Sequence, residues 1–417
     1  LKYQDLYVPR SVLCLITTEN YLKIIYMDLI NKNVESIDPA MVTQLKLADG
    51  TLMPQAAMGT FHSDNPDLEA AMEDIIIEAI RLGYRHLDCA TAYQNEEVVG
   101  RAISKAIESS LVIREELFVL SKLWNKNMKP EEVIPALEQT LKDLGLEYLD
   151  MYLVHWPWPN YHEPGSAGDA VNAHAVPYIH EDFMKVWEKM TELKKSGKVK
   201  NIGTSNQTQK TMELLLRDTD HFNRPSYNQM ELHPLFQQQD FVKYLISEKV
   251  VPSGYMSLGS PRRPGRDRFA EHQADMLHPI IQQVAGETGM TPPEVCLSWA
   301  HQREQNNVGY VAMAERSEWI KSNLACATKE ALSNNQYIKI NGDGSDENLG
   351  INTNNRLIWG QVFFWPEARL LGHDRDLLWN DVQIFETELD YHKFSQAAVK
   401  FYEIWKETAV DLRIKYS

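Results

Sequence analysis

Short apolar runs alternate with amphipathic stretches through most of the chain. The runs end near residues 61, 88, 122 and 155, and further runs follow at 200–204, 226–230, 250–255 and 309–313. Between them, apolar residues recur at helical spacing, as in Met72, Ile75, Ile76, Ala79 and Leu82, and Gly83 ends that stretch. Such spacing predicts helices with one buried face. Strand–helix alternation repeated eight times predicts an α/β fold, a closed parallel (β/α)8 TIM barrel, and favours it over an open sheet.

The barrel pattern leaves three regions along the chain. Residues 1–44 form an N-terminal extension, residues 45–330 form the barrel, and residues 331–417 form a C-terminal extension. Alternation around Asp49-Gly50 predicts a β-hairpin before the first barrel strand. The C-terminal extension reads as a polar loop followed by an amphipathic helix, with Phe394, Ala398, Phe401, Trp405 and Leu412 at helical spacing. This helix either folds back on the barrel or docks on another chain, so residues 1–44 and 387–417 are candidate contacts for a protein partner.

Charge and cysteine content narrow the class of protein. The formal net charge of −16 over 417 residues argues against a nucleic-acid partner, because phosphate binding needs a basic face. The cysteines at 14, 89, 296 and 326 have neither metal-ligand spacing nor the density of a disulfide framework, so we expect no metal site and a reducing compartment. The apolar segment 11–30 is too interrupted by polar residues for a membrane span. We therefore expect a cytoplasmic protein, with an organelle as the alternative because the chain opens at Leu1 rather than Met.

Three successive strand-like runs each lead into an ionisable residue. They reach Asp88, Lys122 and His155, and Tyr93 lies on the loop after the first of them. The C-terminal ends of parallel barrel strands meet at one mouth, so we expect these side chains to converge there. A tyrosine donates a proton near neutral pH when a neighbouring ammonium lowers its pKa. Lys122 would supply that ammonium with Asp88 orienting it, and His155 would place a carbonyl oxygen.

Several ordered motifs carry a resemblance to a known family. They are Gly83-Tyr84-Arg85-His86-Leu87-Asp88-Cys89-Ala90 with Tyr93, Leu153-Val154-His155-Trp156-Pro157, Ile202-Gly203-Thr204-Ser205-Asn206, Asn228-Gln229-Met230-Glu231-Leu232-His233-Pro234 and Leu258-Gly259-Ser260-Pro261. In these residues the sequence resembles the aldo-keto reductases, from about residue 44 to 325, with a weaker similarity at 356–363. The resemblance implies NAD(P)H-dependent reduction of an aldehyde, ketone or sugar carbonyl to an alcohol.

The resemblance also implies roles for individual residues. Tyr93 would be the general acid, Lys122 and Asp88 its tuning pair, and His155 the group that orients the carbonyl. Residues implied to bind the cofactor are Thr60, Phe61, Ser205, Asn206, Gln229, Tyr255, Leu258, Ser260, Arg316, Ser317 and Asn323. Among these, Tyr255 would stack on the nicotinamide ring. Phe61, Trp124 and Trp156 would wall an apolar substrate pocket, although ordinary barrel packing also explains such aromatic residues.

The sequence departs from the family after the eighth strand. Glu315 stands where NADPH-preferring relatives carry a lysine, and a carboxylate there would repel a 2′-phosphate but accept hydrogen bonds from a free ribose. Arg316 beside it could still bind the phosphate. We expect NADPH, with NADH as the alternative. Two other functions stay open, namely a barrel kept as a structural or scaffold subunit of a larger assembly, and a regulatory subunit that senses nicotinamide redox state.

Overall fold

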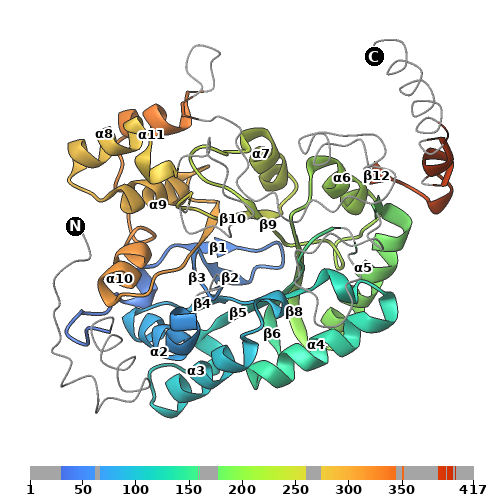
Figure 1. The fold of residues 1–417 in the computed structure, drawn as a ribbon, viewed down its shortest axis with the longest axis horizontal. Helices are drawn as coiled ribbons and strands as arrows, with labels where there is room; N and C mark the ends of the chain where they lie inside the picture. Colours follow the sequence, from blue (N-terminus) through green and yellow to red (C-terminus); the bar gives the residue numbers. More distant parts are fainter. Residues whose placement is uncertain are drawn as a thin grey trace, which may run out of the picture.

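Eight parallel strands close into a barrel at the centre of the protein (Figure 1). The computed structural model describes residues 30–61, 66–157, 159, 177–259, 274–343, 350–351, 384–390, 392–397 and 400. The barrel strands are β3 (Ala56–Gly59), β4 (His86–Asp88), β5 (Phe118–Leu123), β6 (Leu149–Val154), β8 (Val199–Ser205), β9 (Tyr227–Glu231), β10 (Val251–Tyr255) and β11 (Gly309–Ala312). Each strand pairs with its neighbour along the chain, and β11 pairs with β3 to complete the circle. The predicted TIM barrel is confirmed.

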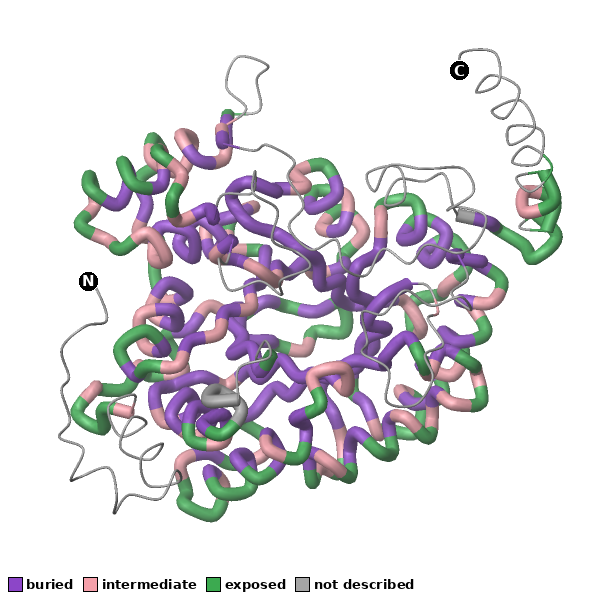
Figure 2. The backbone as a smooth tube through the Cα atoms, viewed as in Figure 1, coloured by how far each residue is buried: buried purple, intermediate pink, exposed green. Residues whose placement is uncertain are grey.

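Helices surround the barrel and turn their apolar faces inward, as the buried stretches in Figure 2 show. They are α2 (Pro66–Leu82), α3 (Glu96–Glu108), α4 (Pro130–Leu144), α5 (His180–Lys195), α6 (Gln209–Arg217), α7 (Gln239–Ser247), α8 (Pro279–Thr288), α9 (Pro292–Gln302), α10 (Ser317–Ala325) and α11 (Asn334–Asn341). The eightfold alternation implied helices in the places of α6, α7 and α10, but no helical spacing marked their bounds in the sequence. Each spans only 9 residues, which is too short for a helical period to repeat clearly.

Glycine follows two of the helices, and for α2 the sequence pattern predicted it. Gly145 after α4 has φ +63°, and Gly83 after α2 has φ +117°. At Gly83 a Cβ atom would lie 2.4 Å from the backbone oxygen of Ile37, so a side chain would clash with the segment that precedes the hairpin. Glycine accommodates both the left-handed conformation and the close approach.

The predicted hairpin closes one end of the barrel. Its strands β1 (Gln44–Lys46) and β2 (Leu52–Pro54) pair antiparallel. Three hairpin side chains, Leu45, Leu47 and Met53, pack with side chains inside the barrel, which are Phe118, Leu120, Met151, Leu153 and Tyr227. The barrel interior is therefore a packed core at this end.

Both extensions contact the barrel in part. The backbone N–H of Asn31 donates to the hydroxyl of Ser317 at 2.8 Å. At the other end of the chain, the short strand β12 (Ile384–Phe385) pairs in parallel with β7 (Tyr178–Ile179), and Glu386 forms an ion pair with Arg217. The predicted tail helix is described only through residues 392–397 and 400, and Ala398, Phe401, Trp405 and Leu412 lie outside the described side chains.

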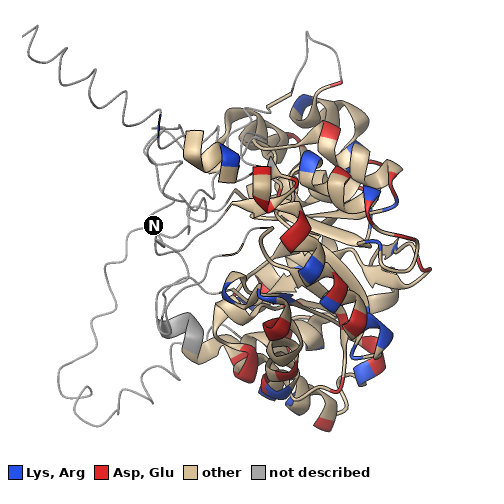
Figure 3. Ribbon diagram, turned by 90° about the vertical axis from the view of Figure 1, so that its right-hand side faces the viewer, with Lys and Arg blue, Asp and Glu red and all other residues tan. Residues whose placement is uncertain are grey.

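Charged residues of both signs are mixed over the outer helices (Figure 3). Several of them form ion pairs between neighbouring helices, such as Glu73 of α2 with Arg101 of α3 at 2.9 Å. Within the described part of the chain, no helix is both long enough and apolar enough to cross a membrane.

Candidate active site

Asp88, Tyr93 and Lys122 meet at the C-terminal end of the barrel. Asp88 is the last residue of β4, Lys122 lies in β5, and Tyr93 ends the 3-10 turn η2 (Thr91–Tyr93). The ammonium of Lys122 donates to Asp88 Oδ1 at 2.7 Å, to the Cys89 carbonyl at 2.9 Å and to the Tyr93 hydroxyl at 3.2 Å. Neighbouring strands thus bring together three residues that are separated in sequence.

Burial and neighbouring charges determine the protonation states of Lys122 and Tyr93. Burial of Lys122 favours the neutral amine, but the Asp88 carboxylate and the Tyr93 hydroxyl outweigh it and raise the lysine pKa above its usual value. The ammonium is therefore retained inside the protein. Burial raises the pKa of Tyr93 to about 12, and Lys122 acts in the opposite direction without overcoming it. Lys122 acts on the tyrosine pKa in the expected direction, but desolvation of the phenolate is the larger influence and the net shift is upward.

His155 directly follows β6 and its ring faces Tyr93. The two ring centroids are 6.0 Å apart and the planes meet edge to face at 81°. Burial, followed by the nearby Lys122 charge, lowers the pKa of His155 well below its usual value, so the imidazole is neutral. The buried Nδ1 atom has no hydrogen-bond partner among the described residues. A neutral imidazole carries one N–H donor and one acceptor nitrogen, so its ring can form a hydrogen bond with a ligand oxygen.

Aromatic side chains surround this polar group. Phe61 is exposed and its ring centroid lies 5.2 Å from that of Tyr93. Trp124 is buried at 5.2 Å from the His155 ring, and Trp156 stacks on the same imidazole at 6.5 Å. The three predicted wall residues therefore lie around Tyr93 and His155.

A second polar cluster joins β8, β9 and β10 beside the first. The Tyr255 hydroxyl donates to Asn206 Oδ1 at 2.7 Å, and Asn206 Nδ2 donates to the His155 carbonyl at 2.9 Å. Ser205 donates to the backbone oxygen of Gln229 at 2.9 Å. Asn206 adopts φ +59°, a left-handed conformation in which asparagine is enriched over most other non-glycine residues. These four predicted cofactor residues form one connected group.

The remaining predicted cofactor residues differ in how accessible they are. Thr60 is buried and its hydroxyl donates to the Asp88 carbonyl at 2.9 Å, while Leu258 is half-buried after β10. Ser260 lies outside the described residues.

Arg316, Ser317 and Asn323 lie at the end of β11 and on α10. Arg316 is exposed, with its guanidinium 5.2 Å from the Trp319 ring centroid. Ser317 is fully buried and donates to Glu78 of α2 at 2.7 Å while it accepts from the Asn31 backbone. The Asn323 backbone oxygen accepts from Tyr310 at 2.8 Å. The Ser317 hydroxyl is therefore already bound within the protein, which the sequence alone did not indicate.

One buried cluster behind Lys122 was missed from the sequence. The Glu96 carboxylate accepts hydrogen bonds from Ser121 at 2.5 Å and Thr140 at 3.1 Å. Thr91 lies 3.1 Å from Thr140 and donates to the Lys122 carbonyl at 3.3 Å. Glu96 opens α3, and a glutamate in the first turn of a helix is typical of a solvent-exposed position that favours the helix dipole. The only sequence feature that could have pointed to this cluster is the position of Glu96, which lies between the strand ends that carry Asp88 and Lys122.

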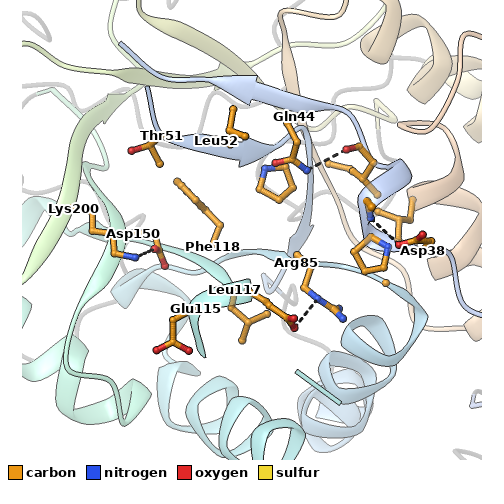
Figure 4. A pocket seen from close by; sticks show the side chains of 18 residues that line it. Asp38, Gln44, Thr51, Leu52, Arg85, Glu115, Leu117, Phe118, Asp150 and Lys200 are labelled. Atoms are coloured by element: carbon orange, nitrogen blue, oxygen red, sulfur yellow. Dashed lines mark hydrogen bonds and ion pairs between the residues drawn. The ribbon is translucent and has the colours of Figure 1, made fainter. Parts of the chain in front are cut away.

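A cavity of about 630 Å³ lies at the other end of the barrel, between the hairpin and the start of β5 (Figure 4). Two of its charged pairs are already formed, Lys200 with Asp150 at 2.9 Å and Arg85 with Glu116 at 3.8 Å. The cavity is thus separate from Tyr93 and Lys122. Among the described residues, no group of three or more His, Cys, Asp or Glu side chains is placed to hold a metal ion.

Comparison with known proteins identifies relatives over the barrel. Residues 57–342 match the sequence profile of the Aldo/keto reductase family. The chain is 35% identical over 309 residues to the aldo/keto reductase slr0942 of Synechocystis sp., covering 71% of this chain and 90% of that protein. It is also 35% identical to glycerol 2-dehydrogenase (NADP(+)) of Saccharomyces cerevisiae, over 71% of this chain and 89% of that protein. Aldo-keto reductase family 1 member A1 of Bos taurus is 35% identical over 62% of this chain and 77% of its own length.

Proposed function

Because the chain belongs to the aldo/keto reductase family, we propose that it reduces an aldehyde, ketone or sugar carbonyl to an alcohol with NADPH. NADH is the alternative cofactor, since the Glu315 carboxylate lies beside Arg316. The observation that carries the proposal is the buried contact of Lys122 Nζ with Asp88 at 2.7 Å and with the Tyr93 hydroxyl at 3.2 Å. A phenol held beside a retained ammonium is suited to give a proton to a reacting oxygen.

The polar cluster beside this pair fits a nicotinamide. A carboxamide carries N–H donors, and the side-chain oxygens of Asn206, Gln229 and Ser205 would accept from them. The half-buried Tyr255, tied to Asn206 by its hydroxyl, offers an aromatic face at the end of β10. These four residues would hold the ring, and the bound cofactor would supply the hydride. Arg316 and Asn323 would meet its adenosine end, whereas Ser317 is engaged by Glu78.

The protein's own residues would then handle the carbonyl oxygen. Neutral His155 would donate a hydrogen bond that places this oxygen within reach of the Tyr93 hydroxyl. As negative charge develops on the oxygen, Tyr93 would transfer its proton, because an alkoxide is a stronger base than a phenolate. The fixed charge of Lys122 would stabilise the phenolate left behind, and Asp88 would keep that ammonium in place. Phe61, Trp124 and Trp156 would limit water around the reacting atoms.

The first test combines cofactor binding with turnover. Titration of the purified protein with NADPH should quench protein fluorescence, and an aromatic aldehyde should then be reduced. Tyr93→Phe should lower kcat at least about 100-fold, the lower end of the range for a lost general acid, while NADPH binding is kept. Tyr148→Phe is the matched control, because Tyr148 precedes β6 and contacts Arg114 and Lys200 at the opposite end of the barrel.

The outcomes are distinct. Loss of turnover in Tyr93→Phe alone supports the proposal. Absence of binding of both NADPH and NADH at millimolar concentration would contradict it and favour a structural subunit. Equal turnover by Tyr93→Phe and the unmodified protein would show that another group donates the proton.

A further inference from the structure

The hydrogen bonds of Glu96 connect the elements that carry Tyr93 and Lys122. Ser121, which donates to one oxygen of this carboxylate, is the residue before Lys122 in β5. Thr91, which donates to the Lys122 carbonyl, begins the same 3-10 turn that ends in Tyr93. The Thr140 hydroxyl of α4 lies 3.1 Å from the Thr91 hydroxyl and 3.1 Å from Glu96 Oε2, and so connects the two. The cluster therefore spans the backbone on both sides of the 3.2 Å contact between lysine and tyrosine.

A carboxylate in this position needs an explanation, because burial of a charge without a cation is costly. Glu96 is 5% exposed, and burial raises its pKa against the opposing hydrogen bonds of Ser121 and Thr140. An ionised carboxylate only accepts hydrogen bonds, so it orients the hydroxyls that surround it. Ser121 and Thr140 donate to Glu96, and Thr91 beside them donates to the Lys122 carbonyl.

The first turn of α3 adds a second constraint. Asn95, directly before Glu96, donates from Nδ2 to the carbonyl of Thr60 at 2.7 Å, and Thr60 in turn donates to the Asp88 carbonyl. The same helix start is thus bound to the end of β3 on one side and to β5 on the other. Displacement of the Glu96 carboxylate would release β5 and the Tyr93 turn from a common anchor.

We propose that Glu96 is a positioning residue, which holds Lys122 against Tyr93 through Ser121, Thr140 and Thr91 without touching substrate. This inference rests on the proposed carbonyl reduction, in which the Lys122–Tyr93 distance governs proton transfer. Displacement of a catalytic group by about 1 Å can cost about 100-fold in rate. The geometry therefore assigns Glu96 an effect on kcat rather than on cofactor binding.

The test uses Glu96→Leu, which removes both acceptor oxygens, and Glu96→Gln, which keeps one. With the full-length protein and a saturating aldehyde, Glu96→Leu should lower kcat about 30- to 100-fold. Its KM and its dissociation constant for NADPH should stay within about twofold, and Glu96→Gln should recover most of the rate. Glu97→Leu is the matched control, since Glu97 is the exposed neighbour in the same turn.

A second set of variants, made in a protein that already carries Lys122→Met, distinguishes an effect through Lys122 from a general structural role of Glu96. If Glu96 acts through Lys122, Glu96→Leu should cause little further loss in a protein that already carries Lys122→Met. Equal fold losses in both backgrounds, or an unchanged kcat in Glu96→Leu, would overturn the assignment. If Glu96→Leu does not fold, Ser121→Ala and Thr140→Val remove the donors singly and should each lower kcat, with unchanged rates overturning the proposal. Absence of binding of both NADPH and NADH to the unmodified protein would instead contradict the proposed function itself.

Discussion

Gln229 donates from Nε2 to Asp88 Oδ2 at 2.6 Å, while the other oxygen of the same carboxylate accepts the Lys122 ammonium. Asp88 therefore connects two groups that the sequence pattern did not link. They are the proton-transfer pair, Tyr93 and Lys122, and the amide cluster that would hold a nicotinamide. Both of its oxygens are satisfied by charged or polar donors inside the barrel. A substitution of Gln229 should therefore affect the position of Lys122 as well as the binding of the cofactor.

We predict that Gln229→Leu affects both cofactor binding and rate. The substitution leaves Asp88 Oδ2 without this donor, and one hydrogen bond to a charged group contributes about 1.5–3 kcal/mol. We expect a lower free energy of unfolding by roughly that amount, weaker NADPH binding and a lower kcat, measured by denaturant titration, fluorescence and steady-state kinetics. Gln209→Leu, at an exposed position of α6, is the control. Weaker binding with an unchanged kcat would show that Gln229 does not reach Lys122 through Asp88.

Removal of Lys122 should destabilise the fold as well as the site. Lys122→Met leaves the Asp88 carboxylate buried without its cation, and breaking a buried pair costs about 3–5 kcal/mol. Asp88→Asn in the same chain removes the unpaired charge, so the double variant should recover part of the loss. Urea unfolding of the two single variants and the double variant measures the coupling. Additive losses would contradict a direct interaction between these two buried charges.

The fold and the reacting residues could be predicted because they depend on local patterns. Asp88, Lys122 and His155 each end or follow an apolar run, and parallel strand ends meet at one mouth of a barrel. Glu96 could not be found this way, because its burial arises from packing between helices that no local pattern encodes. The direction of the Tyr93 pKa shift also depends on burial, which the sequence does not reveal.

The pairing of the two short strands β7 and β12 also could not be predicted from the sequence. Strands β7 and β12 have 2 residues each and lie far apart in the chain, so neither has a period to detect. The engagement of Ser317 by Asn31 and Glu78 likewise needs three segments placed in space. Contacts of this kind follow from tertiary structure alone.

His233 should make stability depend on pH. Burial disfavours its charged form, but Asp275 at 2.9 Å and Glu231 at 3.2 Å outweigh burial and raise the pKa of His233 from 6.5 to about 9. A raised pKa gives stability that is complete below pH 6.5 and is lost as pH rises through about 9. The unfolding free energy should fall by up to about 3 kcal/mol across this window. His233→Gln should remove that dependence, and an equal slope in both proteins would contradict the assignment.

Two helical glycines should respond in opposite directions to alanine. At Gly100 in α3 a Cβ atom would lie 2.6 Å from the Asp143 backbone oxygen in α4, so the helices would have to separate. Overpacking costs about 1–3 kcal/mol and should exceed the gain of about 1 kcal/mol in helix propensity. Gly286 in α8 has open space at that position, so Gly286→Ala should stabilise the protein. Thermal unfolding tests both, and a stabilised Gly100→Ala protein would contradict the close helix contact.

The account rests on Tyr93 and Lys122 acting as one unit in proton transfer. The most direct measurement is kcat for Tyr93→Phe, Lys122→Met and the double variant, at saturating NADPH and aldehyde. Residues that act as a unit give strongly non-additive losses. We expect the double variant to be no slower than Tyr93→Phe alone, within about threefold. Losses that multiply in the double variant would contradict the account.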